Sequence, residues 1–213
     1  MSRQLTSGVL GRKSDYSYLL NNLIAGFDFN GNITDRSSNQ IQLTHLGDND
    51  YTFVEGVNGK QAINLIGTDS FAFNNPGLET SDPCSFSGWM YSTIDKRQGL
   101  FYTGTPQGQV LGVREGRRIH AYIAPATTVQ SDINSYELNV WNHIVSVYEN
   151  EIVKLFLNGI LVAEGQGYPE IDTLFRVCAS SSLPRRWEGK LQECYIFDKA
   201  LNINEVRALA KGI

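Results

Sequence analysis

The sequence is poor in charge and in long apolar runs. Charged residues make up 19% of its 213 residues, against about 25% in an average globular domain. No run approaches the roughly 18 apolar residues that a membrane-spanning helix needs. Residues 1–20 also lack the continuous apolar stretch of a secretory signal. We therefore expect neither a membrane span nor a signal peptide in this sequence.

Cysteine is also scarce. The three cysteines, Cys84, Cys178 and Cys194, include no C-x-x-C pair, and the three histidines show no ligand spacing with them, which disfavours a zinc site. We expect three small buried side chains in a reducing compartment. The alternative is one disulfide with a spare thiol, for which Cys178 and Cys194 are the candidates across strands.

Basic charge is limited as well. The formal net charge is −4, whereas a nucleic-acid-binding domain is usually basic, so we do not expect nucleic acid as a partner. The two short basic clusters, Arg114/Arg117/Arg118 and Arg185/Arg186, are interpreted as solvated turn residues.

The sequence is rich in aromatic residues, at 11%, and in glycine, at 20 residues. Short apolar segments recur between turn signals, which is typical of an all-β sandwich or barrel. We predict strands at residues 23–29, 61–65, 71–73, 85–91, 99–103, 109–113, 118–123, 144–148, 152–157, 160–162, 174–179 and 189–197. Asn158-Gly159 favours a type I′ hairpin turn between two of them.

One helix is predicted near the C-terminus, over residues 203–211. Asn202 and Glu205 have the spacing of a capping box, and Leu201 and Val206 that of a hydrophobic staple. Residues 1–22 are polar and without a period, so we interpret them as an N-terminal arm on a domain over residues 23–213.

Six segments, in this order, carry a family resemblance. They are residues 23–32 (LIAGFDFNGN), 59–65 (GKQAINL), 86–89 (FSGW), 141–145 (WNHIV), 153–159 (VKLFLNG) and 189–197 (GKLQECYIF). Together they resemble the laminin-G-like jelly roll of the concanavalin A-like lectin/glucanase superfamily. The resemblance implies a two-sheet antiparallel jelly-roll sandwich with one short C-terminal helix. Its members include lectins, adhesion modules, glycosidases and structural domains of phage and bacterial surface proteins.

The resemblance offers one test for catalysis. Laminarinase-type members carry Glu-x-Asp-x-x-Glu on one strand, and Glu170 and Asp172 match its first two acids. Leu174 and Phe175 stand where the catalytic acid belongs, and glycosidases need a pair of carboxylates with a proton donor. We therefore expect no enzyme activity.

A candidate ligand site lies on residues 118–123. Alternation places Ile119, Ala121 and Ile123 on one face and His120 and Tyr122 on the other. We expect Tyr102 and Arg114 from neighbouring strands, and Trp187 as an exposed anchor in a late loop. The alternative is an ordinary solvated face. Trp89 and Trp141 are assigned to the core, with His143 as a structural histidine beside Trp141.

Calcium is the ion that the resemblance implies. Asn30, Asn32 and Asp35 offer suitable oxygens in one loop, and Gln192 stands near the position where family members supply another acid. Residues 45–50 form a second acidic loop. A plain polar turn is the alternative reading of each.

Our leading hypothesis for function is a non-catalytic interaction module, a structural subunit of a larger particle such as a phage decoration, fibre or tail protein. Its arm would fasten it to other subunits, and it would lie on the virion or particle surface, with a capacity to bind glycans. The alternative is a free-standing carbohydrate-binding lectin, and a glycoside hydrolase comes third.

Overall fold

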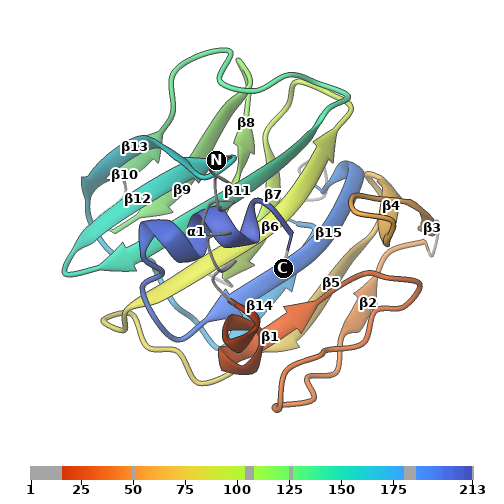
Figure 1. Ribbon diagram of the computed structural model, residues 1–213, viewed down its shortest axis with the longest axis horizontal. Helices are drawn as coiled ribbons and strands as arrows, with labels where there is room; N and C mark the ends of the chain where they lie inside the picture. The colour runs from red at the N-terminus through yellow and green to blue at the C-terminus, as the bar shows by residue number, and fades with distance from the viewer. Residues whose placement is uncertain (1–15, 49–50, 104–107, 125–126, 180–185, 213) are drawn as a thin grey trace, which may run out of the picture.

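The computed structural model describes residues 16–48, 51–103, 108–124, 127–179 and 186–212. The described chain forms two antiparallel sheets packed face to face, with one short helix near its C-terminus (Figure 1). The prediction of an all-β, two-sheet sandwich is therefore confirmed.

The first sheet, sheet A, has the strand order β13-β12-β11-β6-β15-β4-β3, with β1 also paired to β15. Its strands are β1 (Leu23–Phe27), β3 (Thr52–Glu55), β4 (Gln61–Ile66), β6 (Cys84–Ser92), β11 (Trp141–Glu149), β12 (Ile152–Leu157), β13 (Ile160–Gln166) and β15 (Glu188–Phe197). β6 lies at its centre, paired with β11 on one side and β15 on the other.

The second sheet, sheet B, has the order β10-β9-β8-β7-β14-β5-β2. Its strands are β2 (Thr44–Leu46), β5 (Ser70–Asn74), β7 (Gln98–Thr103), β8 (Leu111–Arg114), β9 (Arg118–Ile123), β10 (Thr127–Gln130) and β14 (Leu174–Val177). Strands far apart in the sequence, such as β5 and β14, thus become neighbours.

The main core fills the space between the sheets. Phe86 of sheet A packs on Phe101 and Phe175 of sheet B, with ring centroids 5.6 and 6.4 Å apart. Alternation along each strand sends every second side chain into this layer. All three cysteines are buried there as free thiols, and burial raises the pKa of Cys84 to about 12.

A second apolar cluster lies on the outer face of sheet A. It holds Val145, Phe156 and Phe197 of the sheet against Leu19, Val206 and Leu209. The last two belong to the helix α1 (Ile203–Leu209), and Leu19 belongs to the 3-10 helix η1 (Ser17–Asn22). Figure 1 shows α1 lying across this face of the sheet.

Local sequence signals explain the ends of these elements. The Asn202 side chain accepts hydrogen bonds from the backbone of Asn204 and Glu205, and Glu205 completes the predicted capping box. Asn158 and Gly159 have φ values of 50° and 79°, as the predicted hairpin turn between β12 and β13 requires. β2, β3, β10 and η1 were not among the predicted elements.

The N-terminal segment divides into two parts. Residues 1–15 of the predicted arm lie outside the described residues, whereas Leu19 in η1 is fully buried against the domain. Among the described residues, no helix has the length and apolar character needed to cross a membrane.

Candidate functional site

The outer face of sheet B gathers basic, aromatic and amide side chains. Val113 and Ile119 lie opposite one another on β8 and β9 and face the core, so the alternate residues of these strands point outward. We call this surface the basic face and define it as Arg97, Tyr102, Gln109, Arg114, Arg118, His120, Tyr122 and Arg176. Four of the five predicted ligand residues lie on it, and Trp187 does not.

At the centre of the basic face, Gly112 of β8 leaves space for the side chain of Gln109. A Cβ on Gly112 would lie 2.0 Å from Nε2 of Gln109, so only glycine leaves room for this amide above β8. Gln109 Nε2 donates to the carbonyl of Gln98 at 2.8 Å, and its Oε1 accepts from Arg97 Nε at 3.0 Å. The Arg97 guanidinium in turn lies 4.8 Å from the ring centroid of Tyr122. Backbone, amide, cation and ring thus fix one another in position.

Arginines cover both tyrosine rings of this face. The Arg176 guanidinium lies 5.9 Å from the ring centroid of Tyr102, and Tyr102 is only 4% exposed. His120 is fully buried as well. The expectation that Tyr102 and His120 would present accessible rings is therefore wrong, and Tyr122 is the one half-buried ring of the predicted set. Tyr102 lies on β7, and β8 separates β7 from β9, which carries His120 and Tyr122.

The three tryptophans occupy the opposite environments from those predicted. Trp187, expected to be an exposed anchor, is fully buried in the main core. Trp89 and Trp141, expected in the core, are half-buried on sheet A. Their neighbours on the outer face are His143, 5.2 Å from the Trp89 ring, and Tyr91, 5.6 Å from Trp141. His143 therefore lies beside Trp89, not beside Trp141.

The candidate calcium ligands are engaged in other bonds. Asp35 is buried, and its oxygens accept from the backbone N–H groups of Gly26, Ser37 and Ile41. Such bonds shape the loop between β1 and β2.

The amide ligands of the predicted calcium site are engaged in the same way. The Oδ1 atoms of Asn30 and Asn32 accept from backbone N–H groups, and Gln192 Oε1 accepts from Val57 N–H. The described residues also contain no group of three acidic, histidine or cysteine side chains able to hold a metal. The observed donor set therefore does not fit calcium.

The acids tested for catalysis lie just before β14. The Glu170 carbonyl accepts a hydrogen bond from the Thr103 hydroxyl, and Asp172 Oδ1 accepts from the Thr173 backbone. Phe175, at the position of the expected third acid, is fully buried in the core. A buried phenylalanine side chain thus stands where the motif would need a carboxylate.

A family model described as the concanavalin A-like lectin/glucanases superfamily matches residues 65–207, about two thirds of the chain. No curated protein matches the chain.

Solved structures share the fold at low sequence identity. Domain 4 of AbnA, an extracellular arabinanase from Geobacillus stearothermophilus solved with arabinotriose, is 19% identical, with a TM-score of 0.73 over 89% of this chain and 98% of that one. The binding domain of Paraclostridial Mosquitocidal Protein 1 is 16% identical, with a TM-score of 0.71. The botulinum neurotoxin serotype D binding domain is 14% identical, with a TM-score of 0.67. The last two matches cover 90% and 91% of this chain, which spans about half the length of those domains.

Proposed function

The chain belongs to the concanavalin A-like lectin/glucanases superfamily, and from this premise we propose that it is a non-catalytic carbohydrate-binding module. The observation that carries the proposal is the arrangement on the basic face. The Tyr122 ring is half-buried, and the half-buried guanidinium of Arg97 lies beside it, held in place by the buried Gln109 amide. A ring that stacks on a sugar, next to fixed hydrogen-bond donors, is how proteins orient polyhydroxylated ligands.

Two further observations support this proposal. The arabinanase domain with the same fold was solved with a bound oligosaccharide. In this chain, the buried Phe175 occupies the position of the third carboxylate, which supports binding without hydrolysis. If the chain were a glycosidase instead, it would hydrolyse a β-glucan. The Glu170→Gln variant would then lose that activity.

The test is a glycan array probed with the purified chain, once with calcium and once with chelator. We expect specific binding that Tyr122→Ala abolishes while its melting temperature stays close to that of the parent chain. Tyr91→Ala is the matched control, because Tyr91 is a half-buried tyrosine on the outer face of sheet A. Binding that survives Tyr122→Ala would reject this site, and binding that is lost in chelator would show that a cation takes part at a place other than the predicted loop.

We also propose that the module works as a subunit of a larger particle, such as a phage virion, at the particle surface. The supporting observation is that η1, the described element nearest the N-terminus, is anchored to α1 through Tyr18 and Glu205. Deleting residues 2–15 should abolish incorporation into the particle without changing glycan binding. Normal incorporation of the shortened chain would refute this role.

A further inference from the structure

Charged side chains are segregated between the two sheets. The seven strands of sheet B contain three arginines and no aspartate or glutamate. The strands of sheet A contain five glutamates and two lysines. A chain with a net charge of −4 therefore presents one sheet whose strands carry only positive charge.

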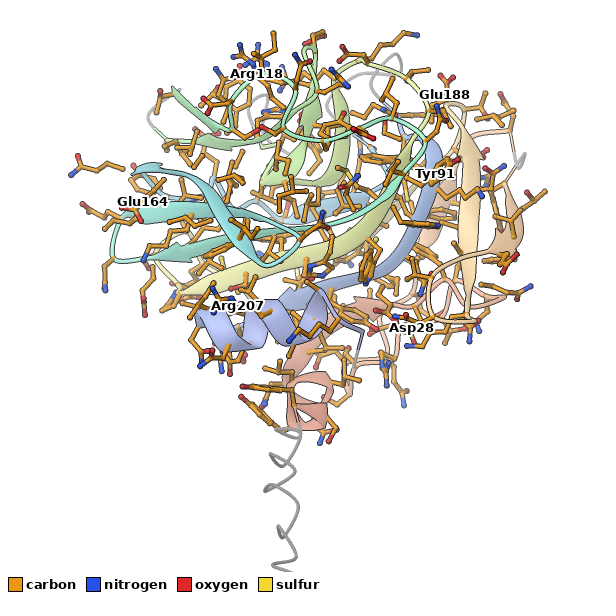
Figure 2. All side chains as sticks on the ribbon, turned by 45° about the horizontal axis from the view of Figure 1, so that its top comes forward. Asp28, Tyr91, Arg118, Glu164, Glu188 and Arg207 are labelled. Atoms are coloured by element: carbon orange, nitrogen blue, oxygen red, sulfur yellow. The ribbon has the colours of Figure 1, made fainter. Side chains whose placement is uncertain are left out.

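Two of these arginines face each other directly. Arg114 at the end of β8 and Arg118 at the start of β9 are partners in the antiparallel register, so their side chains leave the same face of the sheet. Both were interpreted as solvated turn residues. Arg114 lies in β8 instead, and Arg118 begins β9, the strand predicted over residues 118–123. Like charges in directly opposite positions destabilise a sheet. Figure 2 shows Arg118 at the end of the molecule opposite Arg207 of α1.

No described carboxylate neutralises the three arginines. Ion pairs among the described residues involve Arg36, His45, Lys60, Lys154 and Lys199, and none of the sheet B arginines. Arg114 donates to the neutral Gln130 side chain at 3.0 Å. Arg176, on β14 in the middle of the sheet, has a buried Nε with no hydrogen-bond partner. A partly buried guanidinium without an anion is costly, and an external anion would relieve that cost.

We infer that the basic face binds glycans that carry carboxylate or sulfate groups. The inference rests on the proposed function and specifies its ligand. Guanidinium groups bind planar or tetrahedral anions through two parallel N–H donors, so Arg114, Arg118 and Arg176 would hold the charged groups while Tyr122 contacts a sugar ring.

The pocket between the 79–83, 148–151 and 167–169 segments is less suited to an acidic ligand than the basic face. The rim pocket of about 480 Å³ is lined by Glu79, Asp82, Glu149 and Glu151, which would repel the same glycan. A nucleic acid fits less well, because single strands stack successive bases on several rings, whereas Tyr122 is the one tyrosine or histidine ring of the basic face that is not buried.

The experiment is calorimetric titration of the full chain with two matched pairs of probes. One pair is tetragalacturonate and its carboxyl-reduced neutral form, and the other is a heparin tetrasaccharide and its desulfated form. We expect at least one charged probe to bind about tenfold more tightly than its uncharged partner. That preference should shrink as salt rises from about 50 to 500 mM. The pair that shows it identifies the anion as carboxylate or sulfate.

Variants connect the preference to the arginines. Arg176→Gln should weaken binding of the charged probe about tenfold and leave the neutral probe unchanged, and Arg114→Gln provides the same test at a more exposed position. Lys154→Gln on sheet A is the control, since it removes one positive charge from a partly exposed side chain far from the basic face, and it should change neither affinity.

Each contrary outcome has a distinct meaning. Equal binding of charged and neutral probes, or a preference for the neutral form, overturns the inference and leaves the proposed function standing. No binding of any glycan overturns both. A single-stranded oligonucleotide that binds more tightly than every glycan shows that the basic face serves nucleic acid instead.

Discussion

The hydroxyl of Tyr18 donates a 2.6 Å hydrogen bond to Oε1 of Glu205, which lies 187 positions later in the chain. Glu205 also accepts from Lys199 Nζ at 2.7 Å and from the Asn202 N–H at 2.9 Å. Burial alone would raise the pKa of Glu205, but these hydrogen bonds outweigh it and hold the pKa below the usual value. One buried carboxylate thus joins η1, the loop after β15 and the start of α1.

Removing the Tyr18 hydroxyl should therefore loosen the N-terminal segment from the domain. We expect Tyr18→Phe to lower the free energy of unfolding by about 1 kcal/mol, because Tyr18 is exposed and water partly replaces the lost hydrogen bond. Urea denaturation measures this change. Tyr16→Phe is the control, because the Tyr16 ring packs near Tyr18 without a hydroxyl bond to Glu205. Equal stability losses in the two variants would contradict a specific role for the Tyr18 bond.

The strands that could be predicted from the sequence are those with an apolar pattern. The strands that were not predicted are edge strands. β2, β3 and β10 each pair with a single neighbour at the end of a sheet. An edge strand buries less surface, so segments such as 127–130 (TTVQ) need no continuous apolar pattern. The capping box and the Asn158-Gly159 turn depend on local contacts alone and were predicted correctly.

The candidate site shows the same division between local and non-local information. Alternation along β9 correctly placed His120 and Tyr122 on the face opposite Ile119. The coverage of the rings depends on Arg97 and Arg176, which reach Tyr122 and Tyr102 from elements distant in sequence. The basic character of the face emerges only when the strand order is known. The flanking charges of Trp187 similarly suggested exposure, whereas the structure buries it in the main core.

The inverted tryptophan environments predict unequal costs of truncation. Trp187 is fully buried, so Trp187→Ala should lower the free energy of unfolding by about 3–5 kcal/mol. Trp141 is half-buried on an outer face, so Trp141→Ala should cost about 1–2 kcal/mol. Denaturant titrations followed by circular dichroism compare both variants with the parent chain. A larger loss in Trp141→Ala would contradict the packing described for these residues.

A side chain at the glycine of the β12–β13 turn should lower the stability of the fold. Gly159 has a φ of 79°, and a Cβ there would lie 3.0 Å from Cγ of Arg207 in α1. We expect Gly159→Ala to cost about 1–3 kcal/mol, from backbone strain together with displacement of Arg207. Gly59→Ala is a matched control, because Gly59 has a φ of 72° with nothing within 4 Å of its added Cβ. A thermal shift no greater than that of Gly59→Ala would show that the contact with α1 is unimportant.

Burial of His143 predicts a distinct pH dependence. The ring is 2% exposed, its Nε2 lies 2.9 Å from Oγ of Ser87, and its buried Nδ1 has no hydrogen-bond partner. Burial lowers the pKa of His143 to about 3, since nothing beside the ring compensates for a positive charge.

The unfolded chain takes up this proton near pH 6.5 and the folded chain only near pH 3. The folded state therefore loses stability as the pH falls between these values, by up to about 1.4 kcal/mol per pH unit. NMR of the ring protons should show no titration of His143 from pH 8 down to the onset of acid unfolding. In His143→Gln, the fall in unfolding free energy between about pH 6 and pH 4.5 should be shallower than in the parent chain. A ring titration midpoint near pH 6.5 would mean that water reaches the His143–Trp89 pair and that this part of sheet A is open.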